Sequence, residues 1–461
     1  MNKNIRIYSG SVFGLREALF FFFGMFLFGC SSPDTLINND GEQVMADGVV
    51  EANLTRFGPE TYELVRGTPV THSHVFKAFD GGGKLVIQDY DIDKAWIKVN
   101  GATILEPNDF SGEGEIILPL QLKKENTIEV TVPGLSKGKL GVRVTQITQA
   151  NLGLQQQNYF GLQTSDMEAQ REFYNTLGFT GEIYPAGPET STVFARGLGF
   201  TDNYLIHVAL TSLEDPPKPP FIDTVQFRGD SYREEPPYAN LNHIGMAYAT
   251  YSTTDLAGDY LHLKEKGIDF VSSPATAPNG EQFVFLRDQD GTYLKLIQAA
   301  ERHESTPGPN LLRLVNTNMN VADLERSREF YRLLGFTESK PVSQAGSGQF
   351  AKAHGFNESI EFEGEDISLG SDTDGATIQL RQWRDPYDDS PSYPPPVNHL
   401  GIDRIAFSVK DLTSVIKTMT DLGFEQLAPV ASPGGALGSY GLVFFYDPDG
   451  IKIQFSGPLT D

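Results

Sequence analysis

The sequence of 461 residues contains one cysteine, Cys30, and only two tryptophans. A single cysteine excludes an intrachain disulfide bond and any cysteine-rich zinc site. Basic residues are also scarce, because 36 Lys and Arg stand against 60 Asp and Glu, and the formal charge is −24. Such a negative chain is a poor partner for nucleic-acid phosphates. Core-forming residues are plentiful, since 39% are hydrophobic and 31 are phenylalanine. Global disorder is therefore excluded, and the length predicts roughly two to four domains.

No run of apolar residues is long enough for a comfortable membrane span. A basic segment with Lys3, Arg6 and Arg16 precedes an apolar run from Ala18 to Gly29. Because roughly 20 apolar residues span a bilayer, the run predicts a secretion signal over residues 1–29. Cys30 follows it directly. This arrangement resembles a bacterial lipoprotein signal, although an ordinary signal peptide or a chance buried cysteine are the alternatives.

The lipoprotein resemblance implies that Cys30 becomes the mature N-terminus and carries fatty-acyl chains such as palmitate. Two or more acyl chains anchor a protein stably to a membrane. We therefore expect a lipid-anchored protein of the cell envelope, on the extracytoplasmic side of a bacterial membrane. Residues 30–48 are polar and rich in Asn and Asp, which is typical of a tether.

Residues 49–150 show short candidate strands separated by turn residues at about ten-residue spacing. Asn100-Gly101 is a strong hairpin signal, because both residues tolerate a positive φ. The pattern predicts a small all-β sandwich that could bind a glycan or act as a spacer, and we favour the spacer. His72 and His74 share one strand face without a nearby carboxylate, so we expect ordinary strand residues there.

Residues 155–300 and 310–458 are two copies of one domain. Arg-Glu-Phe-Tyr at 171–174 and Leu-Gly-Phe-Thr at 177–180 both recur 157 residues later. Asn-His at 242–243 recurs 156 residues later, and the Asp-x-Asp-Gly at 288–291 recurs 159 residues later. Nearly constant offsets over so long a stretch indicate a duplicated domain.

Each copy contains two halves with the same expected order of strand, helix and three strands. Asp166 and Asp255 in the first copy, and Asp323 and Asp411 in the second, stand where a helix N-cap is needed. A glycine follows each expected helix, where the left-handed conformation that ends helices favours it. The sequence therefore predicts four βαβββ modules.

Paired βαβββ modules, a Phe-Tyr-x-x-Leu-Gly-Phe segment after an Asp-led helix, and an Asp-x-Asp-Gly hairpin resemble the vicinal oxygen chelate superfamily. That superfamily includes glyoxalases, extradiol dioxygenases and bleomycin-resistance proteins. The resemblance implies an α+β fold with two tandem vicinal-oxygen-chelate domains, here preceded by the β-sandwich. It also implies that the two modules of a copy curl into a cup. In metal-dependent members the first and last strands of each module supply His and Glu ligands.

Counting along the family pattern selects one residue on the first strand and one on the last strand of each module. The resemblance thereby implies eight pocket residues: Tyr159, Gln226, Tyr248 and Lys295 in the first copy, and Asn316, Gln379, Arg404 and Gln454 in the second. None is a histidine or a carboxylate, and protonated Lys and Arg repel a divalent ion. Since zinc and iron sites need imidazole, thiolate or carboxylate ligands, we expect no metal cofactor. If the register is shifted, His207 and His243 would be the metal ligands.

These eight positions lead us to expect a metal-free protein that binds a small organic ligand. Arg404 among the amides of the second copy suits an anion such as a carboxylate. Lys295, beside Tyr159 and Tyr248, could act as a base if it is desolvated. The alternatives are a glyoxalase-type lyase, isomerase or dioxygenase with a divergent metal site, and a purely structural module.

Overall fold

The computed structural model describes residues 49–63, 69–90, 92, 94–110, 113–133, 138–183, 188–190, 192–201, 205–300, 308–372, 375–432 and 439–460. The predicted signal peptide, Cys30 and the predicted tether lie outside the described residues. Within those residues, no helix has both the length and the apolar character needed to cross a bilayer.

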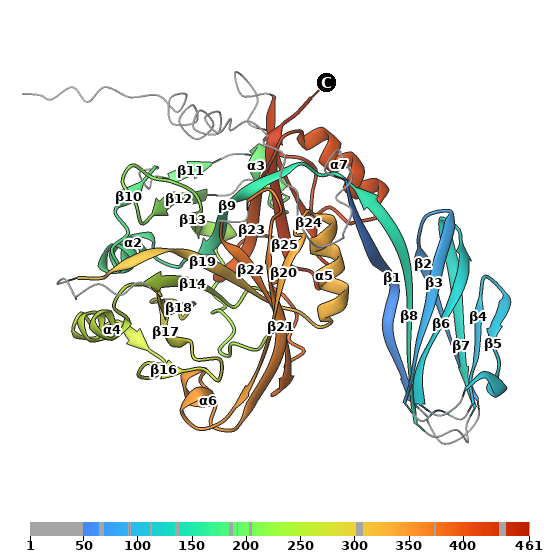
Figure 1. Cartoon of the computed structure of the whole chain (residues 1–461). Helices are drawn as coiled ribbons and strands as arrows, with labels where there is room; N and C mark the ends of the chain where they lie inside the picture. The colour runs from blue at the N-terminus through green and yellow to red at the C-terminus, as the bar shows by residue number, and fades with distance from the viewer. Residues whose placement is uncertain are drawn as a thin grey trace, which may run out of the picture.

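The N-terminal region consists of two antiparallel four-stranded sheets that share one core (Figure 1). Their orders are β1-β8-β3-β6 and β2-β7-β4-β5. The strands are β1 (Val50–Glu63), β2 (Val70–Lys77), β3 (Gly81–Tyr90), β4 (Trp96–Val99), β5 (Ala102–Leu105), β6 (Glu113–Leu122), β7 (Glu125–Val132) and β8 (Lys139–Ala150). Alternate apolar residues such as Leu85 and Ile128 are fully buried between the sheets. The predicted all-β region of antiparallel sheets is confirmed.

The predicted hairpin at Asn100-Gly101 is present between β4 and β5. Both residues have positive φ, 52° for Asn100 and 79° for Gly101, and Val99 pairs directly with Ala102. This conformation matches the right-handed twist of the flanking strands.

The remaining described chain forms four modules that each start with a strand and a helix. The first has β9 (Leu154–Gln163), α2 (Met167–Thr176), β10 (Gly181–Glu182), β11 (Pro188–Thr190), α3 (Thr192–Gly197), β12 (Leu205–Ser212) and β13 (Phe221–Arg228). The second has β14 (Tyr248–Thr253), α4 (Leu256–Glu265), β15 (Asp269–Phe270), β16 (Ala275–Thr276), β17 (Gln282–Arg287) and β18 (Tyr293–Gln298). The predicted α+β class is confirmed.

The second repeat follows the same order. Its first half has β19 (Leu311–Asn320), α5 (Leu324–Leu333), β20 (Glu338–Gly346), α6 (Gln349–Ala353), β21 (Ile360–Ser368) and β22 (Thr377–Asp385). Its second half has β23 (Gly401–Val409), α7 (Leu412–Asp421), β24 (Tyr440–Tyr446) and β25 (Lys452–Pro458). Isolated bridges at Gln426 and Ala431, which pair with β24, take the place of the first of the three expected strands after α7 in the described part of this module.

Local sequence signals set the ends of the four long helices. The Asp166 carboxylate accepts hydrogen bonds from the backbone N–H groups of Glu168 and Ala169 at the start of α2. Asp255, Asp323 and Asp411 each cap their helix through the N–H group three residues later. These bonds satisfy backbone donors that have no partner inside the helix. The four predicted N-caps are confirmed.

The two large sheets combine modules from different repeats. The first and fourth modules share a sheet of order β10-β12-β13-β9-β23-β25-β24, joined by the antiparallel pair β9–β23. The second and third modules share a sheet of order β15-β17-β18-β14-β19-β22-β21-β20, joined by β14–β19. The expectation that the two modules of one copy form a cup together was therefore wrong. Sequence similarity reveals which modules are equivalent but not which of them pair, and elements that follow one another in the chain tend to be neighbours.

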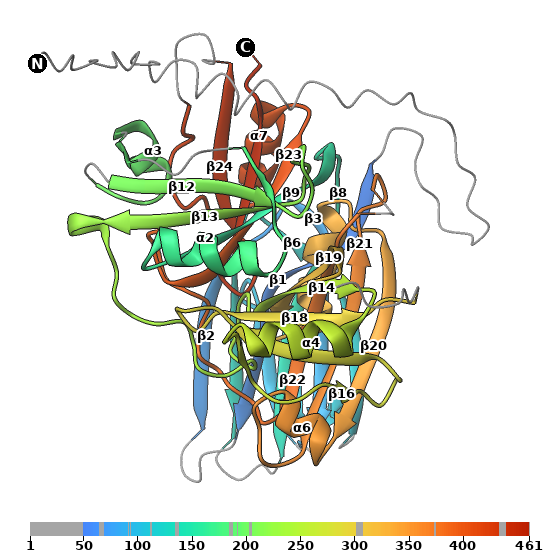
Figure 2. The same cartoon turned by 90° about the vertical axis from the view of Figure 1, so that its left-hand side faces the viewer.

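Helices cover one face of each large sheet, and a single apolar core between helices and strands draws residues from all four modules. In Figure 2, α2 runs alongside β13 of one sheet and α4 alongside β18 of the other. The Asp-x-Asp-Gly turn in the second module of each repeat forms a hydrogen bond with the helix of the first module. Asp288 accepts a 2.9 Å hydrogen bond from the Gln170 amide of α2, and Asp447 accepts a 3.1 Å bond from the Tyr331 hydroxyl of α5.

The N-terminal sandwich rests on the helices of the second repeat (Figure 1). The Asn53 N–H donates to the Glu329 carboxylate of α5 at 2.7 Å, and Arg56 donates to the Leu422 carbonyl beyond α7 at 2.8 Å. Leu54 packs with Leu422 in a small buried cluster at the same contact. The spacer role of the sandwich stays a prediction. The sandwich packs directly against the third and fourth modules.

Candidate functional site

The eight residues predicted to line pockets fall into groups that differ from the expected ones. Tyr159, Arg404 and Gln454 meet in the sheet of the first and fourth modules, where we call them, with Asp223, the 1–4 cluster. Tyr248, Lys295 and Gln379 line a cavity in the sheet of the second and third modules, which we call the 2–3 hollow.

The 1–4 cluster is a network of buried polar and charged groups. The Arg404 side chain is 5% exposed and forms ion pairs with Asp223 and, at 3.2 Å, with Asp403. The Gln454 amide donates to the Tyr159 hydroxyl. Burial raises the pKa of Asp223, while the adjacent Arg404 opposes that shift. A charge in a dry interior is costly unless it is paired, so the two carboxylates account for the buried guanidinium.

Gly161 makes room for the Arg404 side chain. A Cβ atom at this position would lie 2.3 Å from Arg404 Nη1 and 2.6 Å from its Cγ. The guanidinium therefore crosses β9 through the space that a side chain would take, and it reaches Asp223 on the far strand. This makes Arg404 an internal cross-link between the first and fourth modules. The sequence led us to expect Arg404 beside Asn316 and Gln379, and this expectation was wrong. The Arg404 charge is already compensated by the two carboxylates.

Asp223, which the sequence prediction missed, occupies the position assigned to Gln226. Asp223 pairs with Gly161 across β9–β13, whereas the Gln226 amide donates to the Ser165 carbonyl beside α2. The prediction was shifted by three residues, and an odd shift moves a side chain to the opposite face of a sheet. The expectation of no carboxylate at these positions was therefore wrong. The repeat offset was the missed signal, because Asp223 lies 156 residues before Gln379.

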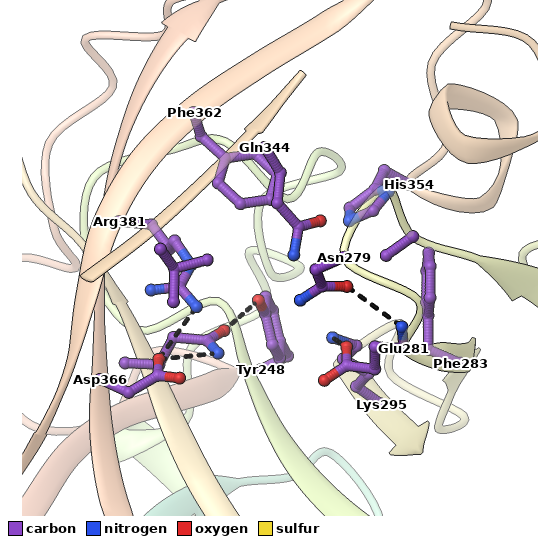
Figure 3. A pocket seen from close by; sticks show the side chains of 13 residues that line it. Tyr248, Asn279, Glu281, Phe283, Lys295, Gln344, His354, Phe362, Asp366 and Arg381 are labelled. Carbon is purple, nitrogen blue, oxygen red and sulfur yellow. Dashed lines mark hydrogen bonds and ion pairs between the residues drawn. The ribbon is translucent and has the colours of Figure 1, made fainter. Parts of the chain in front are cut away.

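The 2–3 hollow is a concave site that is partly open to solvent. Figure 3 shows Tyr248 at its centre, between two charged pairs. The Tyr248 hydroxyl donates to Gln379 at 2.6 Å, and the Gln379 amide donates to Asp366 at 3.2 Å. Arg381 pairs with the same Asp366 oxygen at 3.0 Å. Burial raises the pKa of Tyr248, which keeps its hydroxyl protonated and able to donate.

The other side of the hollow joins a second charged pair to an aromatic wall. Lys295 pairs with Glu281 at 2.5 Å, and its Nζ lies 4.9 Å from the centre of the Phe283 ring. The His354 ring lies 5.0 Å from the same phenyl ring. Burial lowers the pKa of His354 to about 3, and the charge of Lys295 adds to this shift. His354 is therefore a neutral member of the lining at physiological pH.

Sequence reasoning found three of these lining residues and missed the others. Arg381 follows Gln379 by two residues on β22, so the period-two alternation of strands could have found it. Glu281, Asp366 and His354 come from segments that no local signal connects to the hollow. Asn316 is buried beside Thr250 at the β14–β19 seam and is not among the lining residues.

The described residues do not fit the metal-dependent pattern of ligands. Within this part of the chain, no three or more His, Cys, Asp or Glu side chains are grouped to hold a metal ion. Glu281 and Asp366 in the hollow each already pair with a cation. We therefore derive no chemistry through a metal at this site.

The two histidines considered as alternative ligands lie elsewhere. His207 is directly opposite Gln226 on β12, and opposite residues share a face, so it points to the helix side of its sheet. His243 is buried before β14, where its Nδ1 bonds the Asn240 carbonyl at 3.0 Å and its ring lies 4.5 Å from that of Tyr238.

Comparisons with known proteins agree with this architecture. Residues 156–296 and 313–455 match the family model described as the Glyoxalase/Bleomycin resistance protein/Dioxygenase superfamily. Among solved structures, glyoxalase I from Zea mays is 18% identical, with 66% of this chain and 92% of that chain covered and a TM-score of 0.41. A putative dioxygenase from Bacillus subtilis is 12% identical, with 66% and 86% covered and a TM-score of 0.43. A glyoxalase family protein from Bacillus cereus is 24% identical, with 34% and 100% covered and a TM-score of 0.28. None of the curated proteins compared matches the chain.

Proposed function

Because the chain belongs to the glyoxalase/bleomycin resistance protein/dioxygenase superfamily, we propose that it binds a small organic molecule in the 2–3 hollow without a metal ion. One observation carries the proposal. Tyr248, Lys295 and Gln379, which the sequence pattern predicts as pocket residues, come from two repeats and line one cavity. Concave sites with a few converging polar groups are typical of small-molecule pockets.

The chemistry of the lining supports binding without a metal. Lys295 and Arg381 place two cations at the hollow, and the two carboxylates nearest to them are occupied by those cations. A divalent ion would have to displace a protein cation from each carboxylate and would then be repelled by both. Hydrogen bonding by Tyr248, Gln379 and the ion-paired groups is the recognition chemistry that remains.

Membrane anchoring is a separate part of the proposal, and it rests on the sequence around Cys30. We propose that the mature chain is lipidated there and faces the extracytoplasmic side of a bacterial membrane. Labelling of cells with an alkyne analogue of palmitate tests this. Label in the wild-type chain and none in Cys30→Ser is expected, whereas equal labelling of the two would contradict the anchor.

Ligand binding is tested by saturation-transfer NMR with a panel of small organic molecules on the purified protein. A binder is expected whose signal is lost in Tyr248→Phe and kept in Tyr159→Phe. Tyr159 holds the matching position of the first module but belongs to the 1–4 cluster, so it is the matched control. Binding that both variants retain would contradict the proposed site.

Elemental analysis of the same preparation tests the metal-free part of the proposal. Less than stoichiometric zinc, iron, nickel and manganese is expected, together with binding that a chelator leaves unchanged. A stoichiometric metal whose removal abolishes binding would instead favour a metal-dependent lyase, isomerase or dioxygenase.

A further inference from the structure

We infer that the 2–3 hollow takes a neutral, hydroxyl-rich molecule. The inference rests on the proposed ligand-binding function and names the class of ligand. It replaces the anionic ligand that isolated Lys and Arg residues suggested in the sequence.

The charges of the lining argue against an anion. The cationic residues of the hollow are Lys295 and Arg381, and each already contacts a carboxylate, Glu281 or Asp366. An incoming carboxylate would have to compete with one of these partners for its cation. The displaced partner would then be a poorly solvated charge without compensation, which is strongly unfavourable. A neutral ligand leaves both pairs intact.

The same pairs retain hydrogen-bonding capacity that suits hydroxyl groups. Lys295 has three N–H donors and uses one of them on Glu281. Asp366 accepts both of its bonds, from Gln379 and Arg381, through Oδ1, so Oδ2 remains an acceptor. A hydroxyl group donates and accepts at once, and a pair of neighbouring hydroxyls can therefore bridge a cation and its carboxylate.

Two side-chain amides add matched donors and acceptors at the centre of the hollow. Asn279 uses its oxygen to accept from the Glu281 N–H at 3.1 Å, which leaves its Nδ2 available. Gln344 is 8% exposed and forms no side-chain hydrogen bond within the described residues. In Figure 3 the amides of Gln344 and Asn279 point into the same space above Tyr248. Hydroxyl groups of a ligand can accept from the amide nitrogens of Asn279 and Gln344 and donate to the Gln344 amide oxygen.

An aromatic wall supplies the apolar part of the site. Phe283, His354 and Phe362 line the hollow, and His354 is uncharged because burial lowers its pKa to about 3. The carbon-bound hydrogens of a sugar or cyclitol ring can pack against these ring faces, while its hydroxyl groups reach the polar groups around them.

One tryptophan provides a reporter for this site. The Trp383 ring lies 5.1 Å from that of Phe362 and 6.3 Å from that of His354. The other tryptophan, Trp96, lies on β4 of the N-terminal sandwich. The full chain carrying Trp96→Phe therefore reports through Trp383 alone.

The experiment titrates this protein with glucose, galactose and myo-inositol, and with glucuronate and succinate, while following tryptophan fluorescence. Glucose and glucuronate share a ring and differ in one carboxylate, so they isolate the effect of charge. We expect saturable binding of at least one neutral probe and at least tenfold weaker binding of the anions. Saturation-transfer NMR on the same probes detects binding that leaves the fluorescence unchanged.

Variants locate the binding. Gln344→Leu and Asn279→Ala are each expected to weaken the neutral probe at least tenfold, and Gln149→Leu on the exposed face of β8 is the control. Circular dichroism verifies that each variant is folded. Tighter binding of glucuronate or succinate than of every neutral probe would overturn this inference and leave the proposed function standing. Binding of an aromatic or other non-hydroxylated member of the wider panel alone would do the same, whereas no binder of any class would overturn both.

Discussion

Replacement of Arg404 by methionine is expected to destabilise the protein strongly, because it removes the cation from a network that water scarcely reaches. Arg404, Asp223 and Asp403 are 4%, 6% and 4% exposed, respectively. The guanidinium pairs with both carboxylates, so Arg404→Met leaves two buried negative charges in place of a compensated group. Removing one partner of a buried ion pair typically costs about 3–5 kcal/mol, and we expect a loss of that size at pH 7.

The loss should be smaller at pH 5. Burial raises the pKa of Asp223 above its ordinary value of 3.8, and Arg404 opposes that shift in the wild type. Without Arg404 the folded-state pKa rises further, so the native state of the variant binds a proton that the unfolded state releases. Stability then increases as the pH falls from 7 towards the unfolded-state pKa. Lys452, whose own pKa burial lowers, also interacts with Asp403.

Urea denaturation followed by circular dichroism measures this effect. Arg171→Met is the control, because Arg171 pairs with Glu182 at a side-chain exposure of 32% and such pairs contribute only about 0–1 kcal/mol. The double variant Asp223→Asn/Arg404→Met should be more stable than Arg404→Met alone, since it carries one buried charge fewer. A denaturation midpoint for Arg404→Met within error of the wild type, or a double variant no better than the single one, would refute this reasoning.

Three further predictions concern other parts of the fold. Gly161→Ala should lower stability by about 1–3 kcal/mol through overpacking, since its Cβ would lie 2.3 Å from Arg404 Nη1; an unchanged urea midpoint would contradict the close approach. Burial raises the pKa of Asp288 to about 6, so its contribution to stability is present below pH 4 and lost as the pH rises to 6. Asp288→Asn should therefore gain about 2–3 kcal/mol relative to the wild type between pH 4 and pH 8, and a difference independent of pH would show that this carboxyl does not titrate in the fold. Asp166→Ala should cost about 1 kcal/mol by removing the N-cap of α2, as measured by thermal unfolding; Glu168→Ala, exposed in the same turn, is the control, and equal effects of the two would argue against a capping role.

Structural features that depend only on neighbouring residues were predicted correctly from the sequence. Asp166 caps α2, and Asn100-Gly101 forms the expected hairpin, because each depends on hydrogen bonds and dihedral angles within a few residues. The duplicated modules were equally visible, since repeated motifs require no knowledge of how the copies meet.

The candidate site was only partly predictable. Tyr248, Lys295 and Gln379 were found because their positions on the first and last strands repeat between modules. The pairing of modules was not found, because the repeats are equivalent in sequence and both pairings satisfy the same strand patterns. A small error in register was enough to select the wrong residue. A shift of three residues selected Gln226, an amide on the helix side of the sheet, in place of the inward carboxylate Asp223. His354 directly follows the short helix α6, whose approach to the hollow depends on tertiary packing alone.

The nested order of the modules has a consequence for folding. The inner pair of modules is continuous in the chain and can complete its sheet as soon as β22 has emerged. The outer pair must wait, because Gln163 on β9 and Asp403 on β23 touch across their seam although 240 positions separate them. Until the last module arrives, β9 presents a bare strand edge, which is a ready template for wrong partners. The folding chain therefore keeps this edge unpaired until the last module has docked on β9, and incompletely folded chains with unpaired strand edges are prone to aggregate.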